Sequence, residues 1–426
     1  MAITLFAIAF FVMLLLNIPI AMSMCLSSVF YLFITGDIFM ISITAPRFFS
    51  GMNSFTMLAI PLFILSGDLL CSGKASKLLI DMANSMVGHF KGGLSSVTTL
   101  ACMFFGAVSG SGAATASAIG SVVAPESERS GYNKSFIAAI IASAGPLGIL
   151  IPPSIPMVVY GAATDTSIGA LLLSGIGPGV LFGLMIMAYG YWVSSKNNYG
   201  GVSSFELKNV FLSSRKAFWA LLTPVIIVGG IYSGIFTPTE AAAVAAVYSM
   251  IVGLFIYRTL KFRDLPTIFL KSAVSSASIM FVVGGVVLFG WILVREQIPQ
   301  NLTRMILENV SSPITFLLIA DAVVLVAGML MDPSPAIILF APLLLPAAQA
   351  YNIDPVYFGA LMVTNLAIGL VTPPVALTLY VASRICEVSM SKLIKHVLPI
   401  IAMLIIGLLI LTFVPQIAMF LPNLLM

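Results

Sequence analysis

Long apolar stretches alternate with short polar segments along almost the whole chain. A hydrocarbon core about 30 Å thick is crossed by roughly 20 helical residues, so the pattern predicts an all-α polytopic membrane protein. Several of the apolar stretches are short or are broken by proline. We expect ten membrane crossings, at 3–17, 20–36, 52–71, 135–163, 170–194, 217–236, 240–257, 272–294, 356–383 and 396–423.

Two further apolar stretches are interrupted midway by polar, helix-breaking residues. The stretch 93–124 contains Ser109-Gly110-Ser111-Gly112, and the stretch 312–346 contains Asp332-Pro333-Ser334-Pro335. Irregular backbone at membrane depth is tolerated only where protein or a water-filled cavity satisfies its polar groups. We therefore predict two re-entrant hairpins instead of further complete crossings.

The composition excludes a soluble protein. Of the 426 residues, 60% are hydrophobic and only 8% are charged, against about 25% charged in globular domains. The net charge of +4 is small and scattered, which argues against nucleic-acid binding. The four cysteines lack CxxC spacing, so neither a disulfide framework nor a metal centre is indicated.

The basic residues orient the crossings. Cytoplasmic loops of membrane proteins are enriched in Lys and Arg. With both termini on the far side, the cytoplasmic segments would be 72–92, 125–134, 195–216, 258–271 and 384–395. These segments hold all of the 19 Lys and Arg residues except Arg47, Arg295 and Arg304. We therefore expect both termini outside the cytoplasm.

The two halves of the sequence are similar in register. A shift of 221 residues places Pro125 on Pro346, Ser143 on Thr364, Gly148 on Gly369, and Pro152-Pro153 on Pro373-Pro374. Each half then contains five crossings and one hairpin, and an odd number of crossings inverts the second copy. The predicted inverted-topology repeat comprises 1–194 (scaffold 1–92, hairpin 93–124, broken helix 135–163), a cytoplasmic linker 195–216, and 217–426 (scaffold 217–294, hairpin 312–346, broken helix 356–383).

The helix breaks are the candidate binding sites. Proline and glycine release backbone carbonyl oxygens, and Ser and Thr add hydroxyl oxygens; such small neutral ligands suit Na⁺. Helix N-termini beside them favour an anionic substrate. The predicted sodium ligands are Ser109, Ser111, Gly112, Gly145, Gly148, Pro152, Gly328, Asp332, Gly369 and Thr372. The predicted substrate contacts are Thr115, Ser154, Ser334, Asn365 and Pro374. The alternative is that the glycines and prolines only permit close helix packing.

Acidic residues at membrane depth are candidates for function. Asp332 lies at the second hairpin tip, and Asp321 in that hairpin's first limb either serves the pathway or has a structural partner. Enzyme mechanisms find little support. The two His residues, His89 and His396, stand at the ends of apolar segments and not within the membrane, where they could activate Ser111, and the phosphate-binding motif of ATPases is missing from the sequence. We therefore expect a transporter and not an enzyme.

The motifs resemble one family over the whole chain, the large membrane subunit of tripartite ATP-independent periplasmic (TRAP) transporters. The motifs that carry the resemblance are Ser54-Phe55 with Leu58-Ala59-Ile60-Pro61-Leu62-Phe63, Gly88-His89 with Gly92-Gly93, Ser109-Gly110-Ser111, Ile151-Pro152-Pro153-Ser154-Ile155-Pro156, Phe236-Thr237-Pro238-Thr239-Glu240-Ala241, and Gly369 with Thr372-Pro373-Pro374.

The resemblance implies a sodium-coupled importer in the bacterial inner membrane with both termini in the periplasm. It implies an elevator motion, in which hairpins and broken helices carry an organic acid past a static scaffold. The implied substrates are C4-dicarboxylates, sialic acids or sugar acids. The implied partners are a small four-helix membrane subunit and a periplasmic substrate-binding protein. The amphipathic segments 72–92 and 296–311 would brace the scaffold. The alternative is a channel-like or exporter component for small organic anions.

Overall fold

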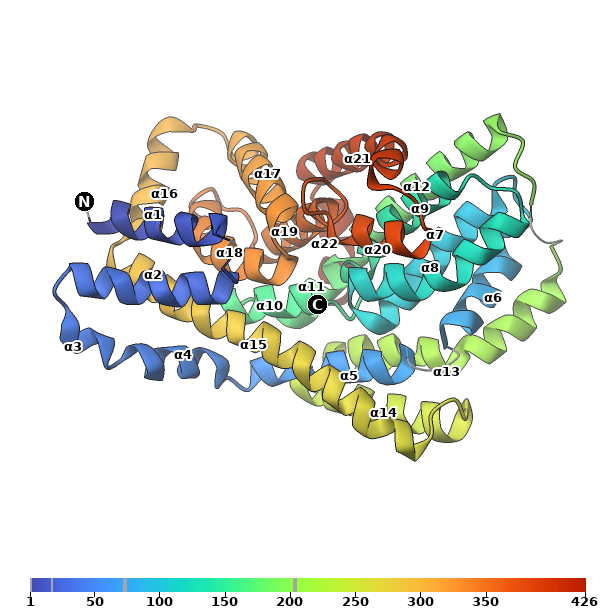
Figure 1. Ribbon diagram of the computed structural model, residues 1–426, viewed down its shortest axis with the longest axis horizontal. Coiled ribbons are helices and arrows are strands. Elements are labelled where there is room, and N and C mark those ends of the chain that lie inside the picture. Colours follow the sequence, from blue (N-terminus) through green and yellow to red (C-terminus); the bar gives the residue numbers. More distant parts are fainter. Residues whose placement is uncertain (1, 17, 72–74, 202–204) are drawn as a thin grey trace.

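The computed structural model describes residues 2–16, 18–71, 75–201 and 205–426, and in this part of the chain the regular elements are all helical (Figure 1). The predicted all-α class is confirmed. In chain order the elements are α1 (Ala2–Leu15), α2 (Ile20–Ile34), α3 (Ile38–Ile41), α4 (Thr44–Met52), η1 (Thr56–Leu58), α5 (Ala59–Cys71), α6 (Ala75–Val87), α7 (Gly93–Ser109), α8 (Gly112–Arg129), α9 (Lys134–Ala144), η2 (Gly145–Ile149), α10 (Ile155–Thr164), α11 (Ile168–Ser174), α12 (Ile176–Lys196), α13 (Leu207–Tyr232), α14 (Pro238–Ile251), η3 (Val252–Ile256), η4 (Phe262–Asp264), α15 (Leu265–Arg295), α16 (Ile298–Asn309), α17 (Pro313–Leu330), α18 (Pro333–Ala350), α19 (Pro355–Gly369), α20 (Leu377–Ile385), α21 (Met390–Phe413) and α22 (Gln416–Leu425).

Many of the apolar segments are not single continuous helices. Among the described residues, 7 helical segments are long and apolar enough to cross a membrane, or up to 8 when the bent pair Ile38–Met52 and Thr56–Cys71 counts as one span. The expected crossings at 135–163 and 356–383 each consist of two shorter helices around a break. Proline explains the breaks, because it cannot donate a helix hydrogen bond and clashes with the preceding turn.

Three predicted boundaries differ from the structure. The segment expected to begin at residue 52 is preceded by helix over 38–52, which meets the next helix at 61°. The segment 396–423 is two helices that separate at Val414 and Pro415. The linker 195–216 is helical from Leu207 onward. The predicted boundary of the linker at residue 216 was wrong, because a membrane helix can continue past the apolar core with its long basic side chains in water.

Both predicted hairpins are present as helix–turn–helix units. The two limbs of the second, Pro313–Leu330 and Pro333–Ala350, are each long and apolar enough to cross a membrane, so its re-entrant course stays a prediction. The first is α7 and α8, joined at Gly110, which has a left-handed φ of 63°. A Cβ at Gly110 would lie 2.5 Å from the carbonyl oxygen of Pro153, so glycine is required there both for the turn and for the close approach. The second is α17 and α18, joined at Met331 and Asp332, with Pro333 opening α18.

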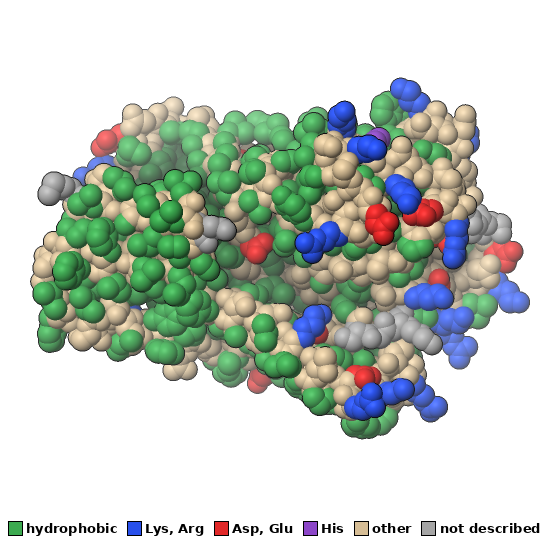
Figure 2. Space-filling model, viewed as in Figure 1, with side chains coloured by type: hydrophobic (Ala, Val, Ile, Leu, Met, Phe, Trp, Pro, Cys, Tyr) green, Lys and Arg blue, Asp and Glu red, His purple; other side chains and the backbone are tan. Residues whose placement is uncertain are grey.

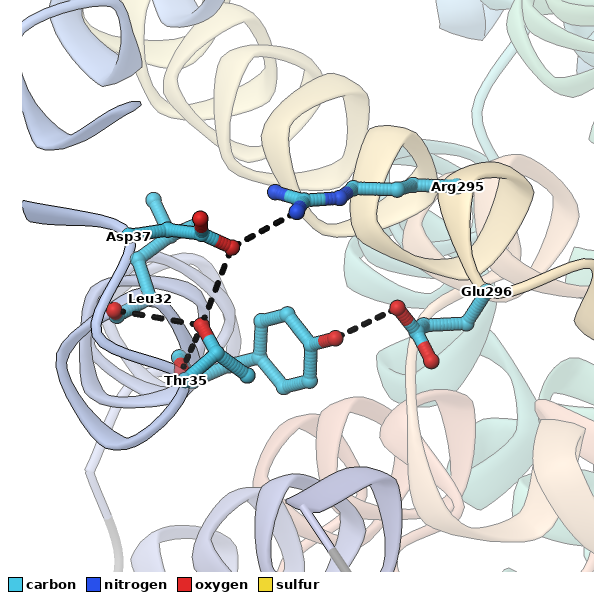
Figure 3. Close-up of polar contacts among 6 residues, drawn as sticks. Leu32, Thr35, Asp37, Arg295 and Glu296 are labelled. Atoms are coloured by element: carbon cyan, nitrogen blue, oxygen red, sulfur yellow. Dashed lines mark hydrogen bonds and ion pairs between the residues drawn. The ribbon is translucent and has the colours of Figure 1, made fainter. Parts of the chain in front are cut away.

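The long helix α15 joins the elements on one side of the molecule. It runs diagonally across Figure 1 and packs against α2, α4 and α5. At its end Arg295 Nη2 donates to Asp37 Oδ2 at 2.6 Å, and Tyr31 on α2 donates to Glu296 (Figure 3). These contacts fix the end of α2 to the end of α15.

The amphipathic segments expected at 72–92 and 296–311 contain helices α6 and α16; residues 72–74 lie outside the described part. Helix α6 packs against α7 and α13. Burial raises the pKa of the Asp81 carboxyl on α6, and the charges of Lys77 and Lys216 oppose this shift. On the face shown in Figure 2, most Lys and Arg side chains gather at the end of the molecule where α6, α8 and α13 lie, while hydrophobic side chains predominate at the opposite end.

Candidate functional site

The tips of the two hairpins meet at one cavity. Its volume is about 270 Å³, and its wall includes Gly110–Ala113 from the first tip and Asp332–Pro335 from the second. Helix α15 closes another side with Ser278, Ile279 and Val282. Among the residues that the structure describes, Asp332 is the only acidic or basic one in this lining. The fold therefore brings together two segments that are far apart in the sequence.

A larger cavity of about 450 Å³ adjoins the first, because Ser111, Ile155 and Ile279 line both. It lies between α5, the first hairpin and α15, and it is rich in hydroxyl groups. The hydroxyl-bearing residues in its wall are Ser109, Ser111, Ser117, Ser121 and Ser275. Ser111 therefore stands at the junction of the two cavities.

The larger cavity also holds an ion pair. Lys271 Nζ donates to Asp68 Oδ1 at 2.8 Å, and Ser272 Oγ donates to Asp68 Oδ2 at 2.8 Å. Lys271 and Asp68 are not among the site residues predicted from the sequence, because each stands at the end of an apolar stretch, where a charged side chain is ordinarily solvated. Only the packing of α5 against α15 reveals that they meet.

The first hairpin tip is ordered by its own hydroxyl groups. Ser109 Oγ and Thr115 Oγ1 are 2.9 Å apart, and Thr115 is fully buried. Ser111 Oγ accepts from the backbone N–H of Ala114 at 3.4 Å and so caps α8. The backbone N–H of Ser111 in turn lies 3.4 Å from Ser109 Oγ. The tip thus presents several oxygen atoms in a small volume.

The first helix break lies directly against this tip. After η2 the chain passes through Pro152 and Pro153, and Ser154 then caps α10 by accepting from the N–H of Met157 at 3.3 Å. The Ser154 hydroxyl donates to the carbonyl of Ile149 at 2.5 Å. Because Ser154 is fully buried and its hydroxyl donates one hydrogen bond and accepts another across the break, it holds the break in this conformation.

The second break is fixed to the second hairpin. Helix α19 ends at Gly369, and Thr372 Oγ1 donates to the carbonyl of Ile368 at 2.7 Å. The N–H of Val375, just after Pro374, donates to the carbonyl of Met329 on α17 at 3.2 Å. The two Pro-Pro bonds at 152–153 and 373–374 are both cis. Each break therefore packs against the hairpin of its own half.

Glycine-to-glycine contacts join each break to its hairpin. A Cβ on Gly106 would lie 2.6 Å from the Cα of Gly148, and a Cβ on Gly369 would lie 2.5 Å from the carbonyl carbon of Gly328. Real Cβ atoms do not approach backbone this closely, so these sites accept only glycine without a backbone shift. This is direct evidence for a packing role of Gly148, Gly328 and Gly369.

The predicted site residues divide into three groups. Those in the walls of the two cavities are Ser109, Ser111, Gly112, Asp332 and Ser334. Those that pack or bond at the breaks and hairpin limbs, outside these two walls, are Thr115, Gly145, Gly148, Pro152, Ser154, Gly328, Gly369, Thr372 and Pro374. Asn365 stands apart: it is fully buried on α19, and its Nδ2 donates to the backbone oxygen of Asp321 at 2.8 Å.

Comparison with known proteins gives the context for this geometry. Residues 7–417 match the model of the DctM component of the tripartite ATP-independent periplasmic transporters. The chain belongs to the DctM family. The resemblance stated from the sequence motifs is therefore confirmed.

The DctM family includes close relatives of this chain. This chain is 45% identical to the C4-dicarboxylate TRAP transporter large permease protein DctM of Pseudomonas aeruginosa, over 89% of each chain. It is 42% identical to the isethionate TRAP transporter permease protein DctMQ of Oleidesulfovibrio alaskensis, over 96% of this chain and 65% of that one. Both of these relatives are named as permeases.

A solved structure shares the fold. The structure of Neisseria gonorrhoeae MtrF, described with a class of antimetabolite efflux pumps, superposes with a TM-score of 0.62 at 15% identity, covering 91% of this chain and 85% of that one. This DctM family member is accordingly a multi-pass membrane protein with a transporter fold.

Proposed function

We propose that this chain is the transport subunit of a secondary active, sodium-coupled importer of a small organic anion. The observation that carries the proposal is the cavity at which Ser111 of the first hairpin and Asp332 of the second share one wall. A binding site at the meeting point of two hairpins and two broken helices is typical of transporters built from repeats.

Sodium is the proposed coupling ion. The tips and breaks carry carbonyl and hydroxyl oxygens, which are the ligands that hard cations prefer. Thr372 donates its only hydroxyl hydrogen to Ile368, so its oxygen lone pairs remain able to face a cation. Asp332 supplies a carboxylate at the first cavity. We assign one sodium ion to the first tip with the break at Gly145–Pro152, and one to the second tip with the break at Gly369–Thr372.

The proposed substrate is an anion. Helices α8 and α18 both begin at the cavity, at Gly112 and Pro333, and helix N-termini attract negative groups. The relatives named above are described as permeases for C4-dicarboxylate and for isethionate, which are both small anions. We therefore assign the anionic group of the substrate to this cavity, beside Ser334. The other substrate contacts predicted from the sequence lie outside its wall; they are Thr115, Ser154, Asn365 and Pro374.

The proposed motion is that of an elevator. The two hairpins and their breaks would move as one body past a scaffold that includes α2, α5, α14 and α15. The contact of Val375 with Met329 and the glycine contacts support this division, because they join each break firmly to its hairpin. An inverted repeat over 1–194 and 217–426 would relate the two halves and would let the site open to either side.

The proposed setting is the bacterial inner membrane, with both termini in the periplasm. The gathering of basic side chains at one end of the molecule (Figure 2) supports a cytoplasmic location for that end. We further propose two partners, a small four-helix membrane subunit and a periplasmic substrate-binding protein. The DctMQ relative extends well beyond the part that this chain matches, which agrees with a second membrane subunit joined to it.

Uptake into proteoliposomes tests the proposal. The vesicles would contain this chain with its small membrane subunit, and labelled C4-dicarboxylates, sialic acid, sugar acids and isethionate would be offered with and without a sodium gradient and a binding protein. We expect uptake that needs both. Flux that persists without the gradient and without the binding protein would instead favour a channel-like component, and sodium-driven efflux would favour an exporter.

A further inference from the structure

A second polar cluster lies outside both cavities, where α17, α19 and α21 pack together. It consists of Asp321 on α17, Asn365 on α19 and Thr412 on α21, which are 8%, 0% and 2% exposed. Thr412 Oγ1 lies 2.8 Å from Asp321 Oδ2, and Asn365 Nδ2 lies 3.2 Å from Asp321 Oδ1. The cluster ties the first limb of the second hairpin to two neighbouring helices.

The cluster has a buried carboxyl group but no cation. Asp321 takes part in none of the ion pairs between described residues. Helices α17, α18 and α19 carry no Lys, Arg or His. The basic residues of α21 end at His396, sixteen positions before Thr412, which is about 24 Å along a helix. The other titratable group that faces the cluster is Tyr357, whose hydroxyl is occupied by the carbonyls of Leu411 and Thr412 at 3.0 Å.

The cluster also has fewer donor hydrogens than hydrogen-bond acceptors. Thr412 has one hydroxyl hydrogen, yet its Oγ1 lies 2.8 Å from Asp321 Oδ2 and 2.9 Å from the carbonyl oxygen of Leu408. The Leu408 carbonyl also accepts the helical N–H of Thr412 within α21, whereas the Asp321 carboxylate has only the neutral donors Thr412 and Asn365. An ionised carboxylate would therefore compete with Leu408 for the single Thr412 hydroxyl hydrogen. Asn365 Oδ1, on the same amide that contacts Asp321, is buried and has no donor either. Buried acceptors without donors are unfavourable, and a buried unpaired charge is more so.

We propose that Asp321 is a proton-binding site of this protein. A proton on Oδ2 is donated to Thr412 Oγ1, and the Thr412 hydroxyl is then free to donate to Leu408. Both observed distances become hydrogen bonds, and the buried negative charge is neutralised. The carboxyl oxygen Oδ1 continues to accept from Asn365.

The site belongs to the second half of the chain alone. At the offset of 221 residues, the positions of Asp321, Asn365 and Thr412 correspond to Leu100, Ala144 and Tyr191. The first half therefore has no matching carboxyl group. Proton binding at Asp321 would strengthen the contact of the second hairpin with α19 and α21, whereas an ionised Asp321 would draw water into that contact.

Infrared spectroscopy of the purified full chain in lipid nanodiscs tests the proposal without any transport assay. A protonated buried carboxyl group gives a C=O stretching band that shifts in D₂O. We expect this band at neutral pH, where exposed carboxylates are ionised, and we expect Asp321→Asn to remove it. Asp165→Asn, which removes an exposed carboxylate, should leave the band in place.

Thr412→Val provides a second variant that retains the carboxyl group and nearly the same side-chain shape. Because Oδ2–H then loses its acceptor, the band should move to higher frequency without disappearing. An unchanged band in Thr412→Val would overturn the proposed position of the proton. A wild-type protein without an Asp321 band, or with carboxylate bands that respond to Na⁺ and lose this response in Asp321→Asn, would overturn proton binding in favour of a solvated carboxylate or a cation site.

Discussion

Ser111 and Asp332 line the same cavity although 221 positions separate them in the chain. Each stands at the tip of a helical hairpin, immediately before the helix of the returning limb. They also correspond at the 221-residue offset used to compare the two halves of the sequence. One residue supplies a hydroxyl and the other a carboxylate, so the two halves present different chemistry at the place where they meet.

Removing the carboxylate at the second tip tests its role in transport. We expect Asp332→Asn to reduce organic-anion uptake to background while the protein stays folded, because the side chain keeps its size and loses only its charge. Uptake and size-exclusion behaviour of the same preparation would be measured. Asp165→Asn is the matched control, and normal uptake by Asp332→Asn would remove Asp332 from the site.

Removing single hydroxyl groups tests the sodium assignment. We expect Ser111→Ala and Thr372→Ala each to raise the sodium concentration that gives half-maximal uptake by about tenfold, since one ligand oxygen is worth ~1–3 kcal/mol. The control is Ser42→Ala, because Ser42 is exposed and donates only to Phe39 in its own segment. An unchanged sodium response in both variants would contradict the assignment.

Adding a methyl group between the second hairpin and its break tests the glycine contact. The Cβ of Gly369→Ala would meet the backbone of Gly328 at 2.5 Å. We expect a loss of ~1–3 kcal/mol of stability, as for other overpacked interiors, seen as a lower thermal unfolding temperature in detergent. Gly229→Ala in α13 has open space around the new Cβ and should cost nothing. Equal stability of the two variants would show that the contact is not tight.

Breaking the contact between α2 and α15 tests how the scaffold is held. Asp37 and Arg295 are about one-third exposed, so a double-mutant cycle with Asp37→Ala and Arg295→Ala should give a coupling energy of ~0.5–1 kcal/mol. The measurement is thermal unfolding at low and high salt, and the coupling should fall as salt screens the charges. Uptake should change little, since both residues lie away from the cavities.

The sequence was sufficient to predict the helical hairpins and the helix breaks of the candidate site. The hairpins expected at 93–124 and 312–346 are present, and helix breaks occur at both Pro-Pro motifs. These features are local. Proline and glycine interrupt a helix wherever they stand, and the length of an apolar segment indicates whether it can cross a membrane. The family was also predicted correctly from the order of the motifs along the chain. The boundaries near 38–52 and 207–216 were not predicted, because short helical segments beside a longer apolar stretch leave no distinct pattern of their own.

Only the tertiary structure decided which of these residues share a site. Ser111, Asp332 and Ser334 came together because the two tips meet at α15, whereas the glycines at the breaks were placed against hairpin backbone. The Lys271–Asp68 ion pair and the Asp321, Asn365 and Thr412 cluster each join helices that are distant in sequence. A sequence pattern reports which face of a helix is apolar, but the partner of a buried polar atom depends on how helices pack, and that is fixed by contacts between distant segments.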